Sequence, residues 1–321
     1  MSNERHREEL ERQVRAIWTP ERLAELTGGR ERPLLPTDAP HLLRGLGILD
    51  ADGRIQARRR RKYRQLNHLL GFLTPAFEEL AANRPLDRPL HVIDAGCGRS
   101  ALGMLLAWWF HRRTPHAVRV HGVDRNRDAI EGCRERARVL GLPGMSFEVA
   151  DLTDLLAAEP AGLAALDGRV DAVLALHACD TATDIALALA VRHQVAFFAV
   201  APCCQAELAR AWAAADVDVL GPLHHNPHFR RTLGATVTDA MRTALLEAQG
   251  YRVRAVEFVE AHHTPKNTLI YGHRTGEAVR EPAEYAALKA RTGGCGIALE
   301  QLVAAPAIRY DAAHGERSES R

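Results

Sequence analysis

The fold is decided by the stretch Val92-Ile93-Asp94-Ala95-Gly96-Cys97-Gly98-Arg99-Ser100. An apolar run ends there in an acidic residue, and two glycines follow before a helical pattern begins at Ala101. Glycine lets the backbone come close to a ligand, and the N-terminus of a helix presents free N–H groups. The stretch therefore predicts a strand, a binding loop and a helix. With Ala101 it also fits the glycine pattern of nicotinamide-binding domains, so it does not identify the cofactor by itself.

Downstream, short apolar runs alternate with helical segments. Strands are expected at residues 90–93, 117–123, 145–149, 170–176 and 194–200. Helices are expected at residues 101–111, 127–140, 183–192 and 236–249. Nearly uninterrupted apolar strands separated by helices indicate a parallel sheet that is covered on both faces.

Two more strands are expected close together, at residues 251–260 and 268–273. The seven residues between them leave no room for a crossover helix, so the last strand is expected to be antiparallel. The predicted fold is α/β, a seven-stranded, doubly wound, mostly parallel sheet whose last strand is antiparallel.

The chain before this sheet is helical and basic. Residues 1–64 carry 15 basic and 10 acidic side chains, whereas the whole chain has a net charge of only +2. Six of the seven residues from Arg58 to Arg64 are basic, and such a run either binds phosphates or forms a solvated helix face. A helix is expected at residues 57–82, kinked or split at Pro75. The predicted regions are a helical N-terminal region (1–84), the sheet domain (85–275) and a C-terminal helical extension with a polar tail (276–321).

Composition excludes several classes of protein. Hydrophobic residues make up 46% of the 321 residues, which is enough for a buried core. The longest apolar stretches are far shorter than the ~20 residues of a membrane span. The first 15 residues alternate glutamate and arginine and lack the apolar segment of a secretory signal. Six cysteines without a regular framework indicate reduced thiols. A cytoplasmic protein without a membrane partner is expected.

Two further carboxylates follow strands. The second strand ends in Gly122-Val123-Asp124, where an acidic side chain is placed to bind ribose hydroxyls. The third strand is followed by Asp151, whose carboxylate is placed to accept a hydrogen bond from the amine of an adenine. The glycine loop, the two acidic strand ends and the reversed last strand together resemble class I S-adenosylmethionine-dependent methyltransferases.

This resemblance implies that S-adenosyl-L-methionine is the cofactor. Asp94 and Gly96–Gly98 are then expected to hold its methionine part, Asp124 its ribose and Asp151 its adenine. The complete set of expected cofactor-binding residues is Asp94, Gly96, Cys97, Gly98, Ser100, Asp124, Arg125, Asp151 and Leu152.

Polar and thiol residues interrupt the apolar pattern after the fourth and fifth strands, in His177-Ala178-Cys179-Asp180-Thr181-Ala182-Thr183-Asp184 and in Pro202-Cys203-Cys204-Gln205. Because the carboxyl ends of parallel strands form the ligand crevice, both segments are expected at one site. Cys179, Cys203, Cys204 and His177 have the donor count of a zinc site. However, adjacent cysteines seldom bind one ion and no Cys-x-x-Cys spacing occurs, so no metal is predicted.

Four separated motifs point to one family within this class of methyltransferases. They are Lys62-Tyr63-Arg64-Gln65-Leu66-Asn67, the segment from His177 to Asp184, Pro202-Cys203-Cys204, and Pro265-Lys266-Asn267-Thr268. Together they resemble a little-characterised methyltransferase-domain family, distantly related to tRNA ribose 2′-O-methyltransferases that act near the acceptor stem. The resemblance covers about residues 60–273. Most relatives carry glycine where this chain has Asp180, which puts the local backbone turn in question.

The resemblance implies methyl transfer, in which the enzyme mainly aligns donor and acceptor. His177, Asp180 and Asp184 are expected near the transferred methyl group, one of them as a base if the acceptor is a hydroxyl. Lys266 and Asn267, in the turn before the last strand, are expected to act beside them on the substrate. The predicted substrate-binding residues are Arg59, Arg61, Lys62, Arg64, Gln65, Cys203 and Cys204.

The predicted substrate is RNA, either tRNA or rRNA, because the basic run adjoins the sheet domain and the distant relatives act on tRNA. Three alternatives stay open at this point: a protein methyltransferase, a catalytically inactive nucleic-acid-binding protein with a methyltransferase-like domain, and a nicotinamide oxidoreductase. The oligomeric state is not predicted.

Overall fold

The computed structural model describes residues 2–157, 166, 168–176, 178, 180–202, 205–215, 221–257 and 268–304. Five residues of the predicted site lie outside this part of the chain: His177, Cys203, Cys204, Lys266 and Asn267. Cys179, which was considered only as a zinc ligand, also lies outside it. Their predicted roles stay predictions.

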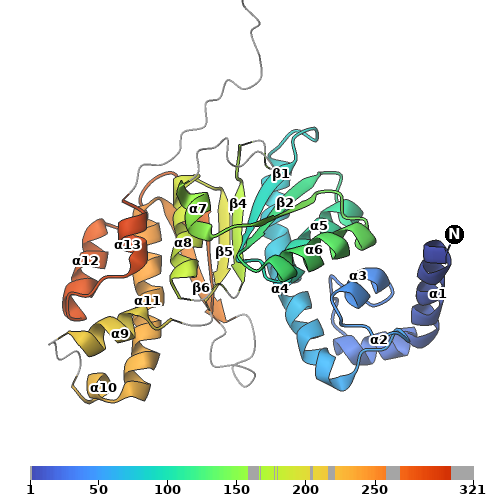
Figure 1. The fold of residues 1–321 in the computed structure, drawn as a ribbon, viewed down its shortest axis with the longest axis horizontal. Helices are drawn as coiled ribbons and strands as arrows, with labels where there is room; N and C mark the ends of the chain where they lie inside the picture. The colour runs from blue at the N-terminus through green and yellow to red at the C-terminus, as the bar shows by residue number, and fades with distance from the viewer. Residues whose placement is uncertain are drawn as a thin grey trace, which may run out of the picture. The chain divides into compact units, whose positions relative to one another are not determined.

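Seven strands form one sheet in the order β3-β2-β1-β4-β5-β7-β6 (Figure 1). Their bounds are β1 Leu90–Ala95, β2 Val118–Asp124, β3 Met145–Val149, β4 Ala172–Leu176, β5 Phe197–Ala201, β6 Tyr251–Glu257 and β7 Thr268–Arg274. Strand β2 pairs in parallel with both β1 and β3, and β4 pairs in parallel with β5. Strand β7 is antiparallel to β5, with Phe197 opposite His273. The predicted mostly parallel sheet with a reversed last strand is confirmed.

Contacts divide the chain into two compact units, one formed by residues 1–150 and 256–269 and the other by residues 151–255 and 270–321. The N-terminal helices therefore group with β1, β2 and β3. The predicted boundaries at residues 84/85 and 275/276 follow sequence composition instead, and they stay predictions.

In the first unit six helices accompany three strands. They are α1 Ser2–Ile17, α2 Pro20–Thr27, α3 Pro40–Gly45, α4 Ala57–Ala82, α5 Ala101–Arg113 and α6 Arg127–Leu140. Helix α4 continues through Pro75, so the alternative that proline splits it is wrong. Its apolar face, which includes Leu70 and Phe77, is fully buried, and that packing holds both sides of the proline in one helix. Asn67 ties α4 to the preceding segment through hydrogen bonds with the backbone N–H and C=O of Leu34.

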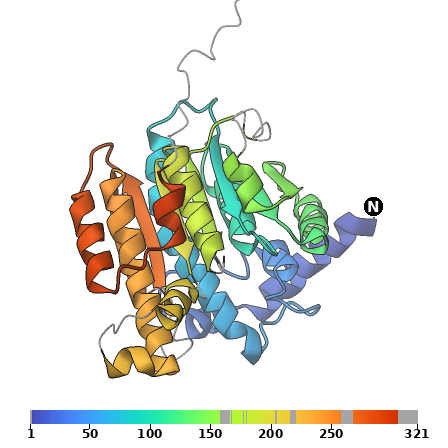
Figure 2. The same ribbon diagram turned by 60° about the vertical axis from the view of Figure 1, so that its left-hand side comes forward.

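In the described part of the second unit seven helices accompany the other strands. They are α7 Leu152–Ala157, α8 Thr181–Arg192, α9 Glu207–Ala214, α10 Pro222–His225, α11 Pro227–Ala248, α12 Pro282–Arg291 and α13 Ala298–Leu302. Helix α11 begins nine residues before the predicted start at residue 236. Asn226 explains the difference, because its side chain accepts hydrogen bonds from the N–H groups of His228 and Phe229 while Pro227 fits the first helical position. Figure 2 shows α11 and α12, in orange and red, packed side by side.

The core of the second unit is built by β4, β5 and α8. Strand β5 is buried along its whole length, and Ala186–Val191 of α8 is buried as well. No helix in the described ranges is long and apolar enough to cross a membrane.

Candidate active site

The glycine loop joins β1 to α5 in the first unit. Gly96 and Gly98 hold φ values of 63° and 52°, in the left-handed region that favours glycine. A Cβ atom at Gly98 would find no atom within 4 Å, so the space beside this residue is open. Ser100 adopts φ 46° as the N-cap of α5, although it is not a glycine. The loop therefore combines an unusual backbone with free space for a ligand.

Asp94 organises this loop from the end of β1. Its side chain is buried, with 3% exposure, and it accepts hydrogen bonds from the Ser100 hydroxyl at 2.8 Å and from the Gly103 N–H. Burial raises the pKa of Asp94 to about 6, although these two hydrogen bonds oppose the rise. Gly103 has no space for a side chain, because a Cβ atom would lie 2.9 Å from the carboxylate. Asp94 and Ser100 were predicted to bind the cofactor, and in the structure they contact each other and shape the loop.

Asp124 connects the end of β2 to the same loop. Its Oδ2 accepts from the Gly98 N–H at 2.8 Å, and its Oδ1 accepts from the Asn126 N–H at 2.8 Å. The carboxylate is only half-buried, and Arg125 beside it is exposed. Each oxygen keeps a further lone pair for a ligand. The structure thus brings together the predicted glycine loop and the predicted ribose-binding carboxylate.

Cys133 of α6 belongs to this site, and the sequence analysis missed it. Its thiol donates to the carbonyl oxygen of Gly98 at 3.3 Å and is hydrogen-bonded to the Cys97 thiol. This hydrogen bond, together with burial, raises the pKa of Cys97, so that thiol stays neutral at physiological pH. A signal was available, because Ile130, Cys133 and Ala137 repeat at helical spacing on the buried face of α6.

Asp151 heads α7 in the second unit. Its Oδ1 accepts hydrogen bonds from the Thr153 N–H at 3.0 Å and from the Thr153 hydroxyl at 2.8 Å. Its side chain is exposed, whereas Leu152 is buried. The expected contacts of Asp151 and Leu152 with adenine stay predictions.

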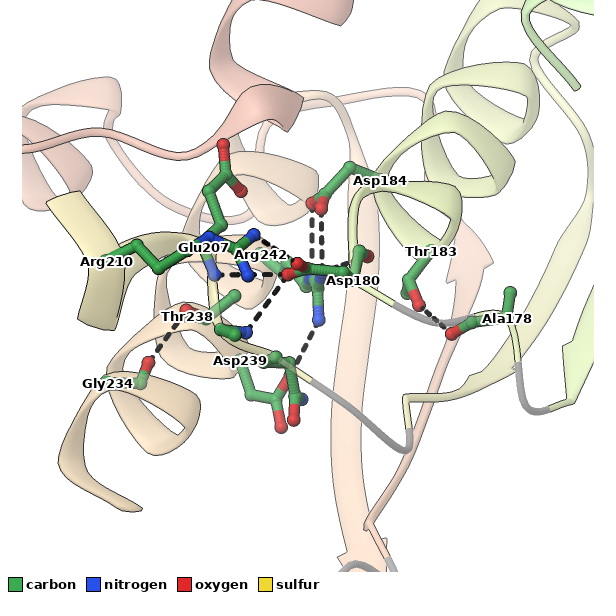
Figure 3. A network of polar contacts seen from close by, with 12 residues as sticks. Ala178, Asp180, Thr183, Asp184, Glu207, Arg210, Gly234, Thr238, Asp239 and Arg242 are labelled. Carbon is green, nitrogen blue, oxygen red and sulfur yellow. Dashed lines mark hydrogen bonds and ion pairs between the residues drawn. The ribbon is translucent and has the colours of Figure 1, made fainter. Parts of the chain in front are cut away.

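Asp184 lies in a buried ion pair between α8 and α11 (Figure 3). Arg242 donates from Nε to Oδ1 at 2.9 Å and from Nη2 to Oδ2 at 2.7 Å, and both side chains are 0% exposed. A carboxylate that is held by two parallel hydrogen bonds without solvent access is unsuited to exchange protons with a substrate. The structure thus places Asp184 in a buried ion pair, and its predicted catalytic role stays a prediction.

Asp180 forms the turn between β4 and α8 with φ 51° and ψ −123°, a conformation typical of glycine. Its Oδ1 accepts from the N–H groups of Ala206 and Glu207, both at 3.1 Å, and its Oδ2 accepts from Arg210 at 2.5 Å (Figure 3). Burial alone would raise the pKa of Asp180, but the hydrogen bonds from Arg210 and from these two amides lower it overall. The turn implied by the family's glycine is thus present, and Asp180 also caps α9. This geometry favours a positioning role over the predicted catalytic one.

Several partners in this network were not predicted. Arg242 donates to Asp239 and to the backbone oxygen of Asp180, both at 3.1 Å, and Gln205 donates to Asp239 at 2.6 Å. Burial raises the pKa of Asp239 and of Glu207. The Oε2 atom of Glu207 is buried and has no hydrogen-bond partner among the described residues. The available signal was the pair Asp239 and Arg242, three residues apart on an otherwise apolar helix face.

The basic run lies on the first turns of α4. Arg58, Arg61 and Arg64 are exposed, whereas Arg59, Lys62 and Gln65, which repeat every third residue, are half-buried. The Lys62 ammonium donates to the carbonyl oxygen of Leu46 at 3.1 Å. Within the described ranges no cluster of three or more potential metal ligands occurs.

Residues 61–211 match the family described as a methyltransferase domain. The match begins in the basic run of α4, contains the glycine loop and the Asp180 turn, and ends in α9. It confirms the resemblance to methyltransferases. No curated protein matches the chain.

Three solved structures are among those that match the chain. The bifunctional kinase-methyltransferase WbdD is 17% identical, with 65% of this chain and 39% of that chain covered and a TM-score of 0.41. An rRNA methylase from Streptococcus thermophilus is 13% identical, with coverages of 62% and 94% and a TM-score of 0.38. The fibrillarin pre-rRNA processing protein of Methanococcus jannaschii is 13% identical, with coverages of 60% and 70% and a TM-score of 0.37. The chain spans about two fifths of the length of the WbdD chains that it matches.

Proposed function

We propose that this chain, which carries a methyltransferase domain, transfers a methyl group from S-adenosyl-L-methionine to RNA. The family match over residues 61–211 supports methyl transfer. The observation that carries the cofactor assignment is the contact between Gly98 and Asp124, which sets a carboxylate beside an open glycine loop.

The residues of this loop fit the cofactor. The open side of Gly98 leaves the backbone accessible, and the two glycine φ values turn the chain sharply at the end of β1. Gly96–Gly98 would hold the methionine part of the cofactor, and the remaining lone pairs of Asp124 would accept from the ribose hydroxyls. When bound, S-adenosylmethionine supplies a methyl group activated by a sulfonium.

The protein's contribution to such a transfer is alignment and exclusion of water, because the displacement needs no proton transfer at the donor. Asp94 and Ser100 hold the loop in one conformation through their 2.8 Å hydrogen bond. In the second unit the Thr183 hydroxyl donates to the Ala178 carbonyl at 2.7 Å, and Arg242 holds Asp180 and Asp184. The turn that contains Asp180 follows His177 in the sequence. We propose His177 as the base when the acceptor is a hydroxyl.

RNA is the favoured acceptor because the start of the methyltransferase domain is basic. The exposed side chains of Arg58, Arg61 and Arg64 lie along one helix whose neighbouring face carries Arg59 and Lys62. A row of cations along a helix attracts a phosphate backbone.

Calorimetric titration with S-adenosylmethionine tests the cofactor. We expect binding to the wild-type chain and a loss of about 10–100-fold in affinity for Asp124→Asn, because a charge-assisted hydrogen bond contributes about 1.5–3 kcal/mol. Asp128→Asn is the matched control, since Asp128 is an exposed carboxylate in the first turn of α6. Equal affinities of the two variants would refute the Asp124 assignment, and binding of a nicotinamide dinucleotide instead would identify an oxidoreductase.

The substrate class is tested by transfer of a labelled methyl group. Total RNA and total protein from a strain that lacks the gene serve as acceptors. Label in tRNA or rRNA supports the proposal. Label in protein alone would reject RNA as the substrate but retain the methyl transfer.

A further inference from the structure

Four cations from three distant segments lie near one another in the first unit, because the charges of Arg59, Arg99 and Arg136 act on Lys62 and Arg136 is hydrogen-bonded to the backbone of Arg99. Arg59 and Lys62 lie on α4, Arg99 lies between Gly98 and Ser100 in the glycine loop, and Arg136 lies on α6. Arg136 donates from Nη1 to the carbonyl oxygen of Arg99 at 2.7 Å, and Lys62 donates to that of Leu46 at 3.1 Å. These backbone contacts hold the two side chains in place without neutralising them.

The cluster lacks compensating carboxylates. None of the four cations forms an ion pair with any residue that the structure describes. Burial lowers the pKa of Lys62, and the charges of Arg99, Arg59 and Arg136 lower it further. The chain places acidic partners elsewhere, because Arg138 on the same helix as Arg136 pairs with Glu135 at 2.6 Å. Arg59, Lys62 and Arg136 are half-buried and Arg99 is exposed. Like charges that are gathered without counter-charges form a ready site for an anion.

We propose that Arg59, Lys62, Arg99 and Arg136 form a phosphate site that binds a backbone phosphate of the RNA substrate beside the cofactor loop. This inference rests on the proposed RNA substrate. Guanidinium groups bind phosphate oxygens through paired N–H donors, and the lysine adds a compact charge. The bound phosphate is next to Arg99, so it anchors the substrate against the loop that we assign to the cofactor.

Phosphate of a nucleic acid is favoured over a free phosphate ion by the surroundings of the cluster. Arg58, Arg61 and Arg64 continue along α4 and are exposed, so that successive phosphates of one strand meet successive cations. A small phosphorylated ligand would be too short to contact these three side chains as well as the cluster.

The test measures the binding of unfractionated tRNA by fluorescence anisotropy at several salt concentrations, without cofactor. For the double variant Lys62→Gln/Arg136→Gln we expect at least tenfold weaker binding. We also expect the slope of log affinity against log salt to fall by about 1.4–1.8, since each lost contact removes about 0.7–0.9. Arg138→Gln, two residues from Arg136 and ion-paired outside the cluster, is the matched control and should bind as the wild type does.

Other outcomes of these measurements would contradict the phosphate site. Wild-type tRNA binding by the double variant would overturn it, as would tight binding of inorganic phosphate to a chain whose tRNA affinity does not respond to the substitutions. The single variant Arg59→Gln, which replaces a cation that makes no side-chain contact with a described carboxylate, repeats the test if the double variant melts early. A wild-type chain that binds tRNA through the cluster but transfers no methyl group would reject the proposed function and leave the phosphate site standing.

Discussion

Asp180 occupies φ 51° and ψ −123°, a backbone region that side-chain-bearing residues reach only at a cost of about 1–3 kcal/mol. Its carboxylate offsets this cost, because it caps two N–H groups of α9 and pairs with Arg210. Hydrogen bonds therefore hold this aspartate in a turn that glycine would adopt freely.

This balance between strain and hydrogen bonding predicts which of two substitutions at Asp180 destabilises the fold more. Asp180→Ala should lower the free energy of unfolding by about 2–3 kcal/mol, because it removes the cap and the ion pair but keeps the strained Cβ. Asp180→Gly should lower it by about 1 kcal/mol less, since glycine releases the strain. Urea unfolding of both variants checks the difference. Equal losses would mean that the backbone at this position carries no strain.

The raised pKa of Asp94 predicts that the free energy of unfolding depends on pH. Its pKa in the folded chain is about 6, above the ordinary value of 3.8, so the folded state binds the proton more tightly than the unfolded state does. Its stabilising contribution is complete below about pH 4 and is lost as the pH rises through 6, by up to about 3 kcal/mol.

Asp94→Asn checks this dependence, because an amide keeps a hydrogen-bond acceptor for Ser100 but does not titrate. Relative to the wild type, the variant should gain stability between pH 4 and pH 7, as measured by urea unfolding at both values. A constant difference between the two chains would show that Asp94 keeps an ordinary pKa in the folded state.

At the scale of elements, α8 and α11 are joined by the Asp184–Arg242 pair, which links residues 58 positions apart. Both side chains are fully buried. Asp184 accepts two hydrogen bonds from Arg242, and Arg242 also donates to Asp239 and to the backbone oxygen of Asp180. Removing one partner of such a pair leaves an unpaired buried charge, whereas removing both does not.

A double-mutant cycle tests this link. Asp184→Leu should destabilise the chain by about 3–5 kcal/mol. Adding Arg242→Met to Asp184→Leu should recover part of that loss, because no buried guanidinium then lacks its partner. Chemical unfolding of the two single variants and the double variant gives the coupling free energy. Additive losses would show that the two side chains stabilise the fold independently.

At the scale of the whole molecule, the cofactor loop is assembled from β1, β2 and α6, and its contacts exist only in the folded chain. A ligand that binds there must stabilise the native state by mass action. S-adenosylhomocysteine, the product of the proposed reaction, is the suitable probe because it carries no reactive methyl group.

At a concentration of 100 times its dissociation constant, S-adenosylhomocysteine should raise the free energy of unfolding by about 2.7 kcal/mol. Scanning calorimetry with and without the ligand measures the shift in melting temperature. Asp124→Asn, at the same ligand concentration, should show a smaller shift than the wild type. A wild-type melting temperature that does not respond to the ligand would contradict the proposed cofactor.

Local patterns determined the strands and the glycine loop. The strand predicted at residues 145–149 has the bounds of β3, and the loop predicted at the two glycines lies where Gly96 and Gly98 adopt positive φ values. The short connection predicted the reversed β7. These features depend on neighbouring residues, on the two-residue period of a strand and on the steric freedom of glycine, all of which can be read along the chain.

Tertiary structure alone decided the roles of individual charged side chains. Asp184 follows an apolar strand like a catalytic carboxylate, but Arg242 neutralises it from a helix that begins 43 positions later, at Pro227. Nothing in the sequence distinguishes Arg99 and Arg136 from the other arginines of this arginine-rich chain. Only the folded structure shows that they lie near Lys62. A side chain's charge, exposure and partners depend on which distant segments pack against it, and no local period of the sequence records that packing.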